Sequence, residues 1–221
     1  MAERLSPTPV RGRKPVKVEP ETILNAALQV FADHGVSGAS IRAIAKVAGC
    51  DPGLIYYHYE SKEGIFSALL DRLFRELSQR MDELLEASRS QPIQEQLRQL
   101  MHLIASLLRE RGRALPGIVR GEVVRGAESF RPLVAQHIAV PIGRIRELFE
   151  RGIASGELRG DLVLPLMPLF YMRPLVEIVE LVPTMAPHLG FGDSDTLDVA
   201  LTAWFDLFWR GIAADPSRSS Q

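Results

Sequence analysis

Residues 40–59 read SIRAIAKVAGCDPGLIYYHY, and this stretch decides the fold of the N-terminal part of the chain. Ser40 is a preferred N-cap residue, apolar side chains follow it at helical spacing, and Gly49 has the backbone freedom to end a helix. Asp51 caps a second short helix, with Pro52 in its first position. Two short helices joined by a few residues form a helix-turn-helix.

The second of these helices carries small residues first and aromatic residues afterwards. When a helix-turn-helix binds DNA, the N-terminal residues of its second helix face base edges in the major groove. Four aromatic side chains end the stretch: Tyr56, Tyr57, His58 and Tyr59. A helix this short cannot bury four rings on one face. Some of them must therefore point outward, where hydroxyl and imidazole N–H groups can bond phosphates. Tyr59 follows the inward face and is predicted to lie in the core.

The pattern extends beyond two helices. The segments SIRxIAxxAG (40–49), GLIYYHY (53–59) and SKE (61–63) resemble the signature of the TetR family of bacterial transcription regulators. The detailed similarity covers residues 19–70. The family usually has a small apolar residue where Cys50 stands and Phe where Tyr59 stands, and both replacements are mild.

The resemblance assigns roles to individual positions. It implies that Ser40, Tyr56, His58 and Lys62 lie near phosphates and that Arg42 and Tyr57 lie closest to base edges. Arginine can bridge guanine O6 and N7, and a lysine at a helix N-terminus would reinforce the exposed N–H groups there. Leu54 is placed to touch thymine methyl groups. The predicted DNA-binding residues are Ser40, Arg42, Pro52, Gly53, Leu54, Tyr56, Tyr57, His58 and Lys62.

The flanking segments also have helical periodicity. Residues 19–35 predict a helix that ends at Gly35, and Ser61 caps a helix that is predicted to run to about Ala87. A helix of that length spans about 40 Å and exceeds a small three-helix unit. Further helices are predicted over 93–111, 115–127, 132–154 with a bend at Pro141, 162–182 and 194–214. No segment alternates like a strand, so the predicted fold is all-α.

These segments divide the chain into four parts. We predict a disordered basic arm (1–18), a helix-turn-helix domain (19–65), a helical effector-binding and dimerisation domain (66–215) and a tail (216–221). Residues 1–62 hold eight basic and six acidic side chains, whereas the whole chain has a net charge of −1. The arm could enter a minor groove or could be a solubilising tail.

Bulk properties exclude several classes of protein. Cys50 is the single cysteine, which rules out an intramolecular disulfide, and it is interpreted as a small buried filler rather than a redox switch. No apolar segment predicts a signal peptide or a membrane span, so a cytoplasmic protein without a membrane partner is expected. His102, His137 and His188 are too scattered to indicate a metal site, and no cofactor is expected.

The C-terminal part offers a weaker set of candidates for an effector site. Methionine and aromatic side chains suit an adaptable apolar pocket, although core packing explains them equally well. The predicted ligand-binding residues are Met101, Met167, Phe170, Tyr171, Arg173 and Glu177. Arg173, Glu177 and Glu180 could line the cavity, form ion pairs across a dimer seam or face solvent.

Three functions remain in competition. The resemblance implies a homodimer on a palindromic operator, joined through a four-helix interface of residues 162–182 and 194–214, and a repressor released by a small-molecule effector. A DNA-binding protein without such an effector is the second hypothesis. A helical enzyme is the third, but no catalytic motif is apparent.

Overall fold

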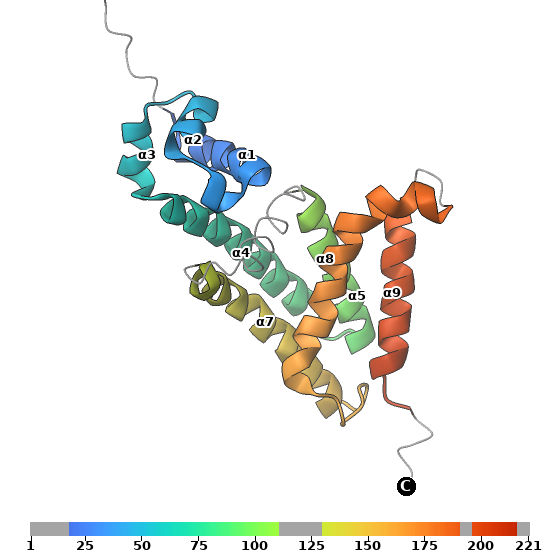
Figure 1. The fold of residues 1–221 in the computed structure, drawn as a ribbon. Helices are drawn as coiled ribbons and strands as arrows, with labels where there is room; N and C mark the ends of the chain where they lie inside the picture. The colour runs from blue at the N-terminus through green and yellow to red at the C-terminus, as the bar shows by residue number, and fades with distance from the viewer. Residues whose placement is uncertain (1–17, 111–129, 191–195, 216–221) are drawn as a thin grey trace, which may run out of the picture.

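The computed structural model describes residues 18–110, 130–190 and 196–215 (Figure 1). Across these ranges the secondary structure is helical, apart from an isolated bridge between Leu158 and Ala213. The all-α prediction is therefore confirmed. The basic arm up to residue 17, the predicted helix over 115–127 and the tail lie outside the described residues.

Three helices form the N-terminal unit: α1 (Pro20–Gly38), α2 (Ile41–Ala48) and α3 (Pro52–Tyr59). The predicted end at Gly35 is marked by a break in helical geometry, with φ 69° and ψ 167°. A further turn forms after this kink, so α1 ends three residues later than predicted. Glycine tolerates the positive φ that this kink requires.

Helix α4 (Lys62–Ala87) runs from the N-terminal helices to the C-terminal helices (Figure 1) and contributes to two hydrophobic cores. Phe66 and Leu70 are buried with the side chains of α1, α2 and α3, whereas Leu77 and Met81 are buried with those of the C-terminal helices. We call residues 18–70 the head and the remaining described residues the body. The change of core lies between Leu70 and Leu77, a few residues after the predicted domain boundary at 65.

The body contains α5 (Ile93–Glu110), α7 (Phe130–Ala154), α8 (Met167–Met185) and α9 (Thr196–Ile212), with short 3₁₀ turns at Leu164–Leu166 and Ala186–Leu189. The predicted helix over 162–182 was wrong at both ends. Residues 162 and 163 are not helical, and residues 164–166 form a tighter 3₁₀ turn. Helix α8 starts after this turn, at Met167, with Pro168 in the first turn, where proline is tolerated. It then continues through Pro174 and Pro183, as α7 continues through Pro141.

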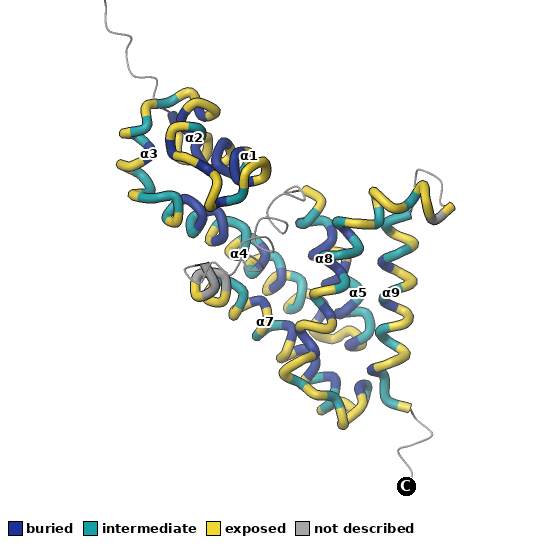
Figure 2. The backbone as a smooth tube through the Cα atoms, viewed as in Figure 1, coloured by how far each residue is buried: buried dark blue, intermediate teal, exposed yellow. Residues whose placement is uncertain are grey.

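Burial follows the inner faces of the helices (Figure 2). An aromatic cluster fills the space between α7, α8 and α9: Phe149 packs edge-on against Tyr171, and Trp204 stacks on Phe208 with ring centroids 5.2 Å apart. Part of the apolar surface of the last helix is therefore used within the chain. Leu207, on the same helix, is 71% exposed.

Candidate nucleic-acid interface

Local capping sets the geometry of the helix-turn-helix. The Oγ of Ser40 accepts a hydrogen bond from the amide of Ala43 at 3.1 Å, and the Oδ1 of Asp51 accepts one from Gly53 at 2.7 Å. Between them Gly49 ends α2 in the left-handed conformation, with φ 68°. All three predicted capping residues are confirmed, and together they fix where α2 stops and α3 starts.

Helix α3 buries Ile55 in the head and turns Tyr56 and Tyr57 outward. Ile55 is buried, whereas Tyr56 is 55% and Tyr57 80% exposed. The ring of His58 lies edge-on to that of Tyr57, with centroids 5.1 Å apart. The prediction that some of the aromatic side chains point outward is confirmed, and these two tyrosines form a ridge on the outer side of the head.

Tyr59 is partly buried against the head core, as predicted. Its hydroxyl donates a hydrogen bond to the carbonyl of Pro20 at 3.0 Å, which joins the end of α3 to the start of α1. Burial raises the pKa of this phenol, the neighbouring Glu21 raises it further, and Arg72 lowers it. The hydroxyl is therefore a structural donor at neutral pH.

The other predicted DNA-binding residues of α2 and α3 differ in exposure. Ser40, Arg42 and Gly53 are exposed, whereas Pro52 and Leu54 are half-buried and Leu54 packs against the head core. Sequence reasoning missed Val47, which is exposed on α2 beside the predicted positions. The signal was present, because Val47 lies outside the inner stripe of Ile41 and Ile44.

Lys62 is placed differently from the tyrosines. Its ammonium donates hydrogen bonds to three backbone carbonyls, those of Val36 at 3.1 Å, Ser37 at 3.1 Å and Ala39 at 2.9 Å. These carbonyls belong to the end of α1 and the connection to α2. Lys62, the first residue of α4, therefore connects α4 to the end of α1 and to the segment that joins α1 to α2.

The joint between α3 and α4 is tight. Glu60 adopts a positive φ of 61°, and the Oγ of Ser61 accepts a hydrogen bond from the amide of Gly64 at 3.0 Å. A Cβ atom at position 64 would overlap the carbonyl oxygen of Tyr59. Glycine at this position therefore allows the first turn of α4 to pack closely against the end of α3.

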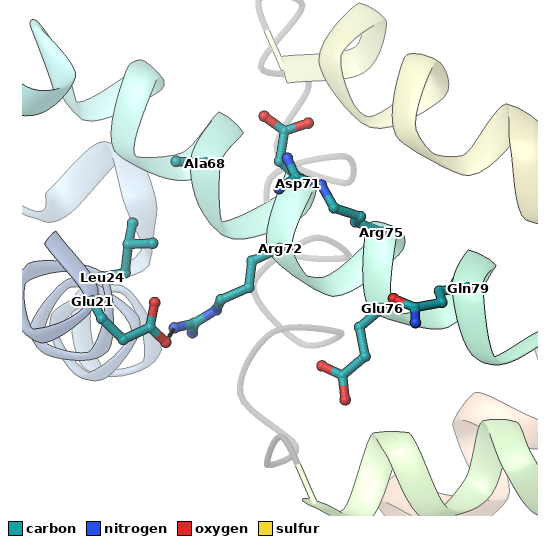
Figure 3. Close-up of a pocket in the computed structure, with 8 residues that line it drawn as sticks. All are labelled: Glu21, Leu24, Ala68, Asp71, Arg72, Arg75, Glu76 and Gln79. Atoms are coloured by element: carbon teal, nitrogen blue, oxygen red, sulfur yellow. Dashed lines mark hydrogen bonds and ion pairs between the residues drawn. The ribbon is translucent and has the colours of Figure 1, made fainter.

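A groove of about 420 Å³ lies between α1 and α4 (Figure 3). Arg72 reaches across it from α4, pairs with Glu21 and donates to Asn25 at 3.1 Å. Eight residues line the groove: Glu21, Leu24, Ala68, Asp71, Arg72, Arg75, Glu76 and Gln79. The residues predicted to bind an effector are not among them.

The structure separates those predicted effector residues into two groups. Met101, Met167 and Tyr171 are buried in the body core, and the hydroxyl of Tyr171 donates to the carbonyl of Leu97 at 2.5 Å. The others face outward: Phe170 is 52% exposed, and Arg173 forms an ion pair with Glu177 at 3.0 Å one turn further along α8. The set therefore does not converge on one cavity.

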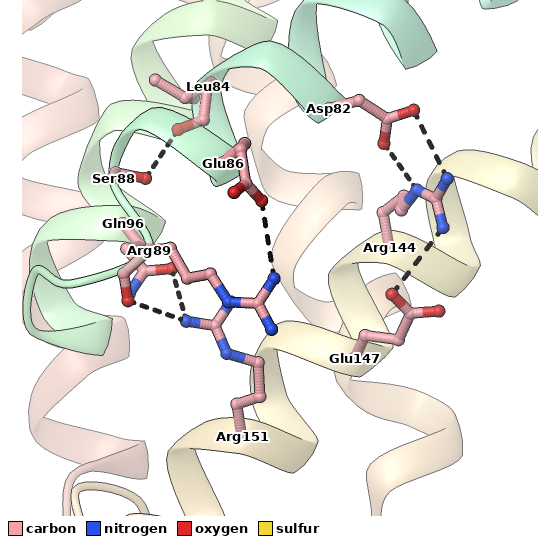
Figure 4. A network of polar contacts seen from close by, with 9 residues as sticks. All are labelled: Asp82, Leu84, Glu86, Ser88, Arg89, Gln96, Arg144, Glu147 and Arg151. Atoms are coloured by element: carbon pink, nitrogen blue, oxygen red, sulfur yellow. Dashed lines mark hydrogen bonds and ion pairs between the residues drawn. The ribbon is translucent and has the colours of Figure 1, made fainter.

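Polar contacts fix the second half of α4 to the body (Figure 4). Asp82 accepts two hydrogen bonds from Arg144 of α7, at 2.6 and 3.3 Å. Further along α7, Arg151 donates to the carbonyl of Arg89 and to the side chain of Gln96. A displacement of α7 would therefore change or strain its polar contacts with α4.

Within 18–110, 130–190 and 196–215, no three His, Cys, Asp or Glu side chains gather in a way that could hold a metal ion. No helix in this part of the chain is long and apolar enough to cross a membrane.

A capped helix pair whose second helix faces outward is the arrangement that helix-turn-helix proteins use to bind DNA. Here a long helix connects this pair to the rest of the chain. The family model described as bacterial regulatory proteins, tetR family, matches residues 23–69. Over 191 residues the chain is 27% identical to the HTH-type transcriptional repressor AcnR of Corynebacterium glutamicum, a match that covers 85% of this chain and 93% of that protein. Over 48 residues it is 42% identical to the HTH-type transcriptional regulator UidR of Escherichia coli, covering 22% of this chain and 24% of UidR.

Solved structures share the whole fold. The transcriptional regulator FadR from Bacillus subtilis, in complex with stearoyl-CoA, superposes with a TM-score of 0.69 at 22% identity and covers 88% of this chain and 100% of its own. The ketosteroid transcriptional regulator KstR2 of Mycobacterium tuberculosis gives a TM-score of 0.68 at 20% identity, over 90% of this chain and 97% of its own. Residues 23–69 therefore match the model of a family of bacterial regulatory proteins, and the chain is similar over most of its length to a transcriptional repressor.

Proposed function

We propose that this protein is a homodimeric repressor that binds a palindromic operator through its head and releases it when a small molecule binds the body. The observation that carries the proposal is that one unbroken helix, α4, is built into both hydrophobic cores. A change of packing in the body would therefore alter the position of the head without an intermediate hinge.

The proposed DNA surface is the ridge of α3 with the outer side of α2. Tyr57 and Arg42 are exposed and are assigned to base edges, and Tyr56, His58 and Ser40 are assigned to phosphates. The backbone at Pro52 and Gly53 is assigned to close approach, and Leu54 to a thymine methyl group. Val47 adds an apolar contact at the edge of this surface.

The proposed dimer interface lies on α8 and α9. Exposed large apolar side chains lie on these helices and on the turn before α8: Leu166, Leu169, Phe170, Leu181, Met185, Val199 and Leu207. Large apolar side chains gathered on adjacent helices favour association, and a two-fold dimer uses the same surface on both copies. Two heads related in this way would reach successive major grooves about 34 Å apart, which requires a palindromic site.

The proposed effector site is the body core around Met101, Met167 and Tyr171. Methionine side chains repack readily, and the Tyr171 hydroxyl is a polar group within this apolar region. An effector that enters there would displace α7 or α8 and, through Asp82 and Arg144, α4.

Selection of genomic fragments by the purified full chain, followed by footprinting, tests the DNA part of the proposal. A protected palindrome with half-sites one helical turn apart is expected, whereas binding that is equal on all fragments would contradict a sequence-specific regulator.

Release by an effector requires a separate test. A panel of apolar compounds, beginning with the stearoyl-CoA bound by the Bacillus subtilis structure, would be titrated into the complex with the selected fragment. A compound that weakens DNA binding must itself bind the DNA complex more weakly by the same factor.

The mechanism of release is tested on the distance between the two heads. Spin labels on Asp33→Cys in a Cys50→Ser background, at an exposed position of α1, report that distance. Effector that changes DNA affinity while the distance stays the same would contradict transmission through α4. If no compound releases the DNA, a regulator without a small-molecule effector becomes the better account.

A further inference from the structure

The ammonium group of Lys62 has no N–H group left for a phosphate in this arrangement. A lysine ammonium carries three N–H donors, and the structure gives it three carbonyl acceptors at 2.9 to 3.1 Å, on Val36, Ser37 and Ala39. The side chain is half-buried among them. A phosphate contact would require at least one of these bonds to break.

The carbonyls bonded by Lys62 lie in the last turn of α1 and at its C-cap, Ala39. The last carbonyls of a helix lack the amide partner one turn ahead, and a cation at a helix C-terminus also interacts favourably with the helix dipole. The kink at Gly35 interrupts the regular helix geometry just before these carbonyls. Lys62 thus adds three charge-assisted bonds to a corner where the amide of Ala39 already donates to the carbonyls of Gly35 and Val36, at 3.2 and 3.3 Å.

This corner determines where the DNA surface starts. Ala39, one of the three acceptors, directly precedes Ser40, which caps α2. Arg42 follows in the first turn of α2. Because Lys62 is the first residue of α4, it connects the helix shared with the body to the start of the helix that carries Ser40 and Arg42.

We propose that Lys62 is a positioning residue of the DNA interface, which holds the end of α1 and the start of α2 against α4 and acts on DNA through Ser40 and Arg42 rather than by bonding a phosphate itself. This inference rests on the proposed assignment of the head as the DNA-binding surface. It also links α1 and α2 to the first turn of α4, so a shift of α4 carries α1 and α2 with it.

Two substitutions separate positioning from phosphate contact. Lys62→Arg keeps the charge and suits a phosphate well, but its planar fork cannot direct three N–H groups at three converging carbonyls. Lys62→Met keeps the apolar stem and removes all donors. Lys46→Met is the matched control, because it removes a lysine from an exposed position on the neighbouring helix.

For both Lys62 variants we expect a melting temperature lower by about 4–8 °C, against about 1–2 °C or less for the Lys46→Met control. On the selected genomic fragment, at a temperature where all variants are folded, both should bind roughly 5- to 30-fold more weakly with the salt dependence of the wild type. Amide hydrogen exchange should accelerate at residues 36–43 and stay unchanged in the body. A residue that affects only global stability would not change the affinity of the folded protein.

Three results would overturn the proposal. One is a Lys62→Arg variant with wild-type stability and affinity, beside a Lys62→Met variant whose salt slope falls by about 1, the signature of a lost phosphate contact. The second is wild-type DNA affinity in both variants, which would leave Lys62 a purely structural residue. The third is an unchanged melting temperature in both. If the wild type binds no fragment specifically, the proposed function fails instead, and the melting and exchange data still report on the three carbonyl bonds.

Discussion

The carboxylate of Asp71 on α4 lies 2.7 Å from Nε2 of His137 on α7. The next residue along α4, Arg72, reaches in the other direction, to Glu21 and Asn25 of α1. Two adjacent residues thus connect the middle of α4 to the body and to the head. They lie on the turn where the helix passes from one hydrophobic core to the other.

A double-mutant cycle of Asp71→Ala and His137→Ala measures the first of these links. The His137 ring also packs beside Phe74, so its truncation alone removes more than the polar contact. Because Asp71 is half exposed, we expect a coupling free energy of only about 0.5–1 kcal/mol in urea unfolding. Strictly additive single effects would show that the pair does not join α4 to α7 in solution.

The tight joint between α3 and α4 predicts opposite effects for two glycine substitutions. Gly64→Ala would place its Cβ against the carbonyl oxygen of Tyr59, and we expect a loss of about 1–3 kcal/mol of unfolding free energy. Gly143→Ala, inside α7 and with no atom near the added Cβ, should gain about 0.5–1 kcal/mol from helix propensity. Chemical denaturation of both variants checks the sign, and equal stability of the two would contradict the close approach.

Tyr171 predicts a pH-dependent stability difference. Burial raises the pKa of its phenol well above the ordinary value, whereas in the unfolded chain the group ionises near pH 10. Above about pH 10 the unfolded state therefore loses a proton that the folded state keeps, and the folded state is destabilised as pH rises.

Tyr171→Phe removes this effect together with the hydrogen bond to Leu97. We expect the variant to be about 0.5–1.5 kcal/mol less stable than the wild type at neutral pH and the difference to shrink as pH rises beyond about 10. Urea unfolding at pH 7, 9.5 and 10.5 measures both values. A difference that stays constant over this range would show that the phenol ionises equally in both states.

The short-range features of the head could be predicted because they depend on neighbouring residues. Ser40, Gly49, Asp51 and Ser61 act on backbone groups two to four positions away, so their types and spacing already determine the helix ends. Helix length alone predicted that some of the four aromatic side chains point outward, but not which ones. Helix capping is a local interaction, so it can be predicted without knowing how the rest of the chain folds.

Long-range contacts could not be predicted in the same way. The bonds from Lys62 span 23 to 26 positions, and nothing in its local sequence shows that three carbonyls converge there. The positions of the candidate effector residues in the body could not be predicted for a related reason, since the start of α8 depends on how three prolines are accommodated. A periodic apolar segment does not reveal which of its residues will face the core.

The proposed dimer predicts a change of oligomeric state on one substitution. Leu207→Glu places a carboxylate in the proposed interface and should raise the dimer dissociation constant by roughly 100-fold or more, because a buried unpaired charge is strongly unfavourable. Val140→Glu, on an exposed position of α7, is the control that adds the same charge elsewhere. Light scattering coupled to size exclusion reports the mass, and a dimeric Leu207→Glu protein would place the interface on another surface.

The most direct test is fluorescence anisotropy of the full chain on its selected genomic fragment, with Tyr57→Ala beside the wild type and with competitor DNA present. Since Tyr57 is 80% exposed, its truncation should leave the melting temperature within about 1–2 °C. Its affinity for the selected fragment should fall about 10- to 100-fold while binding to competitor DNA is retained. Full preference for the selected fragment in Tyr57→Ala would contradict the claim that this face of α3 reads the DNA.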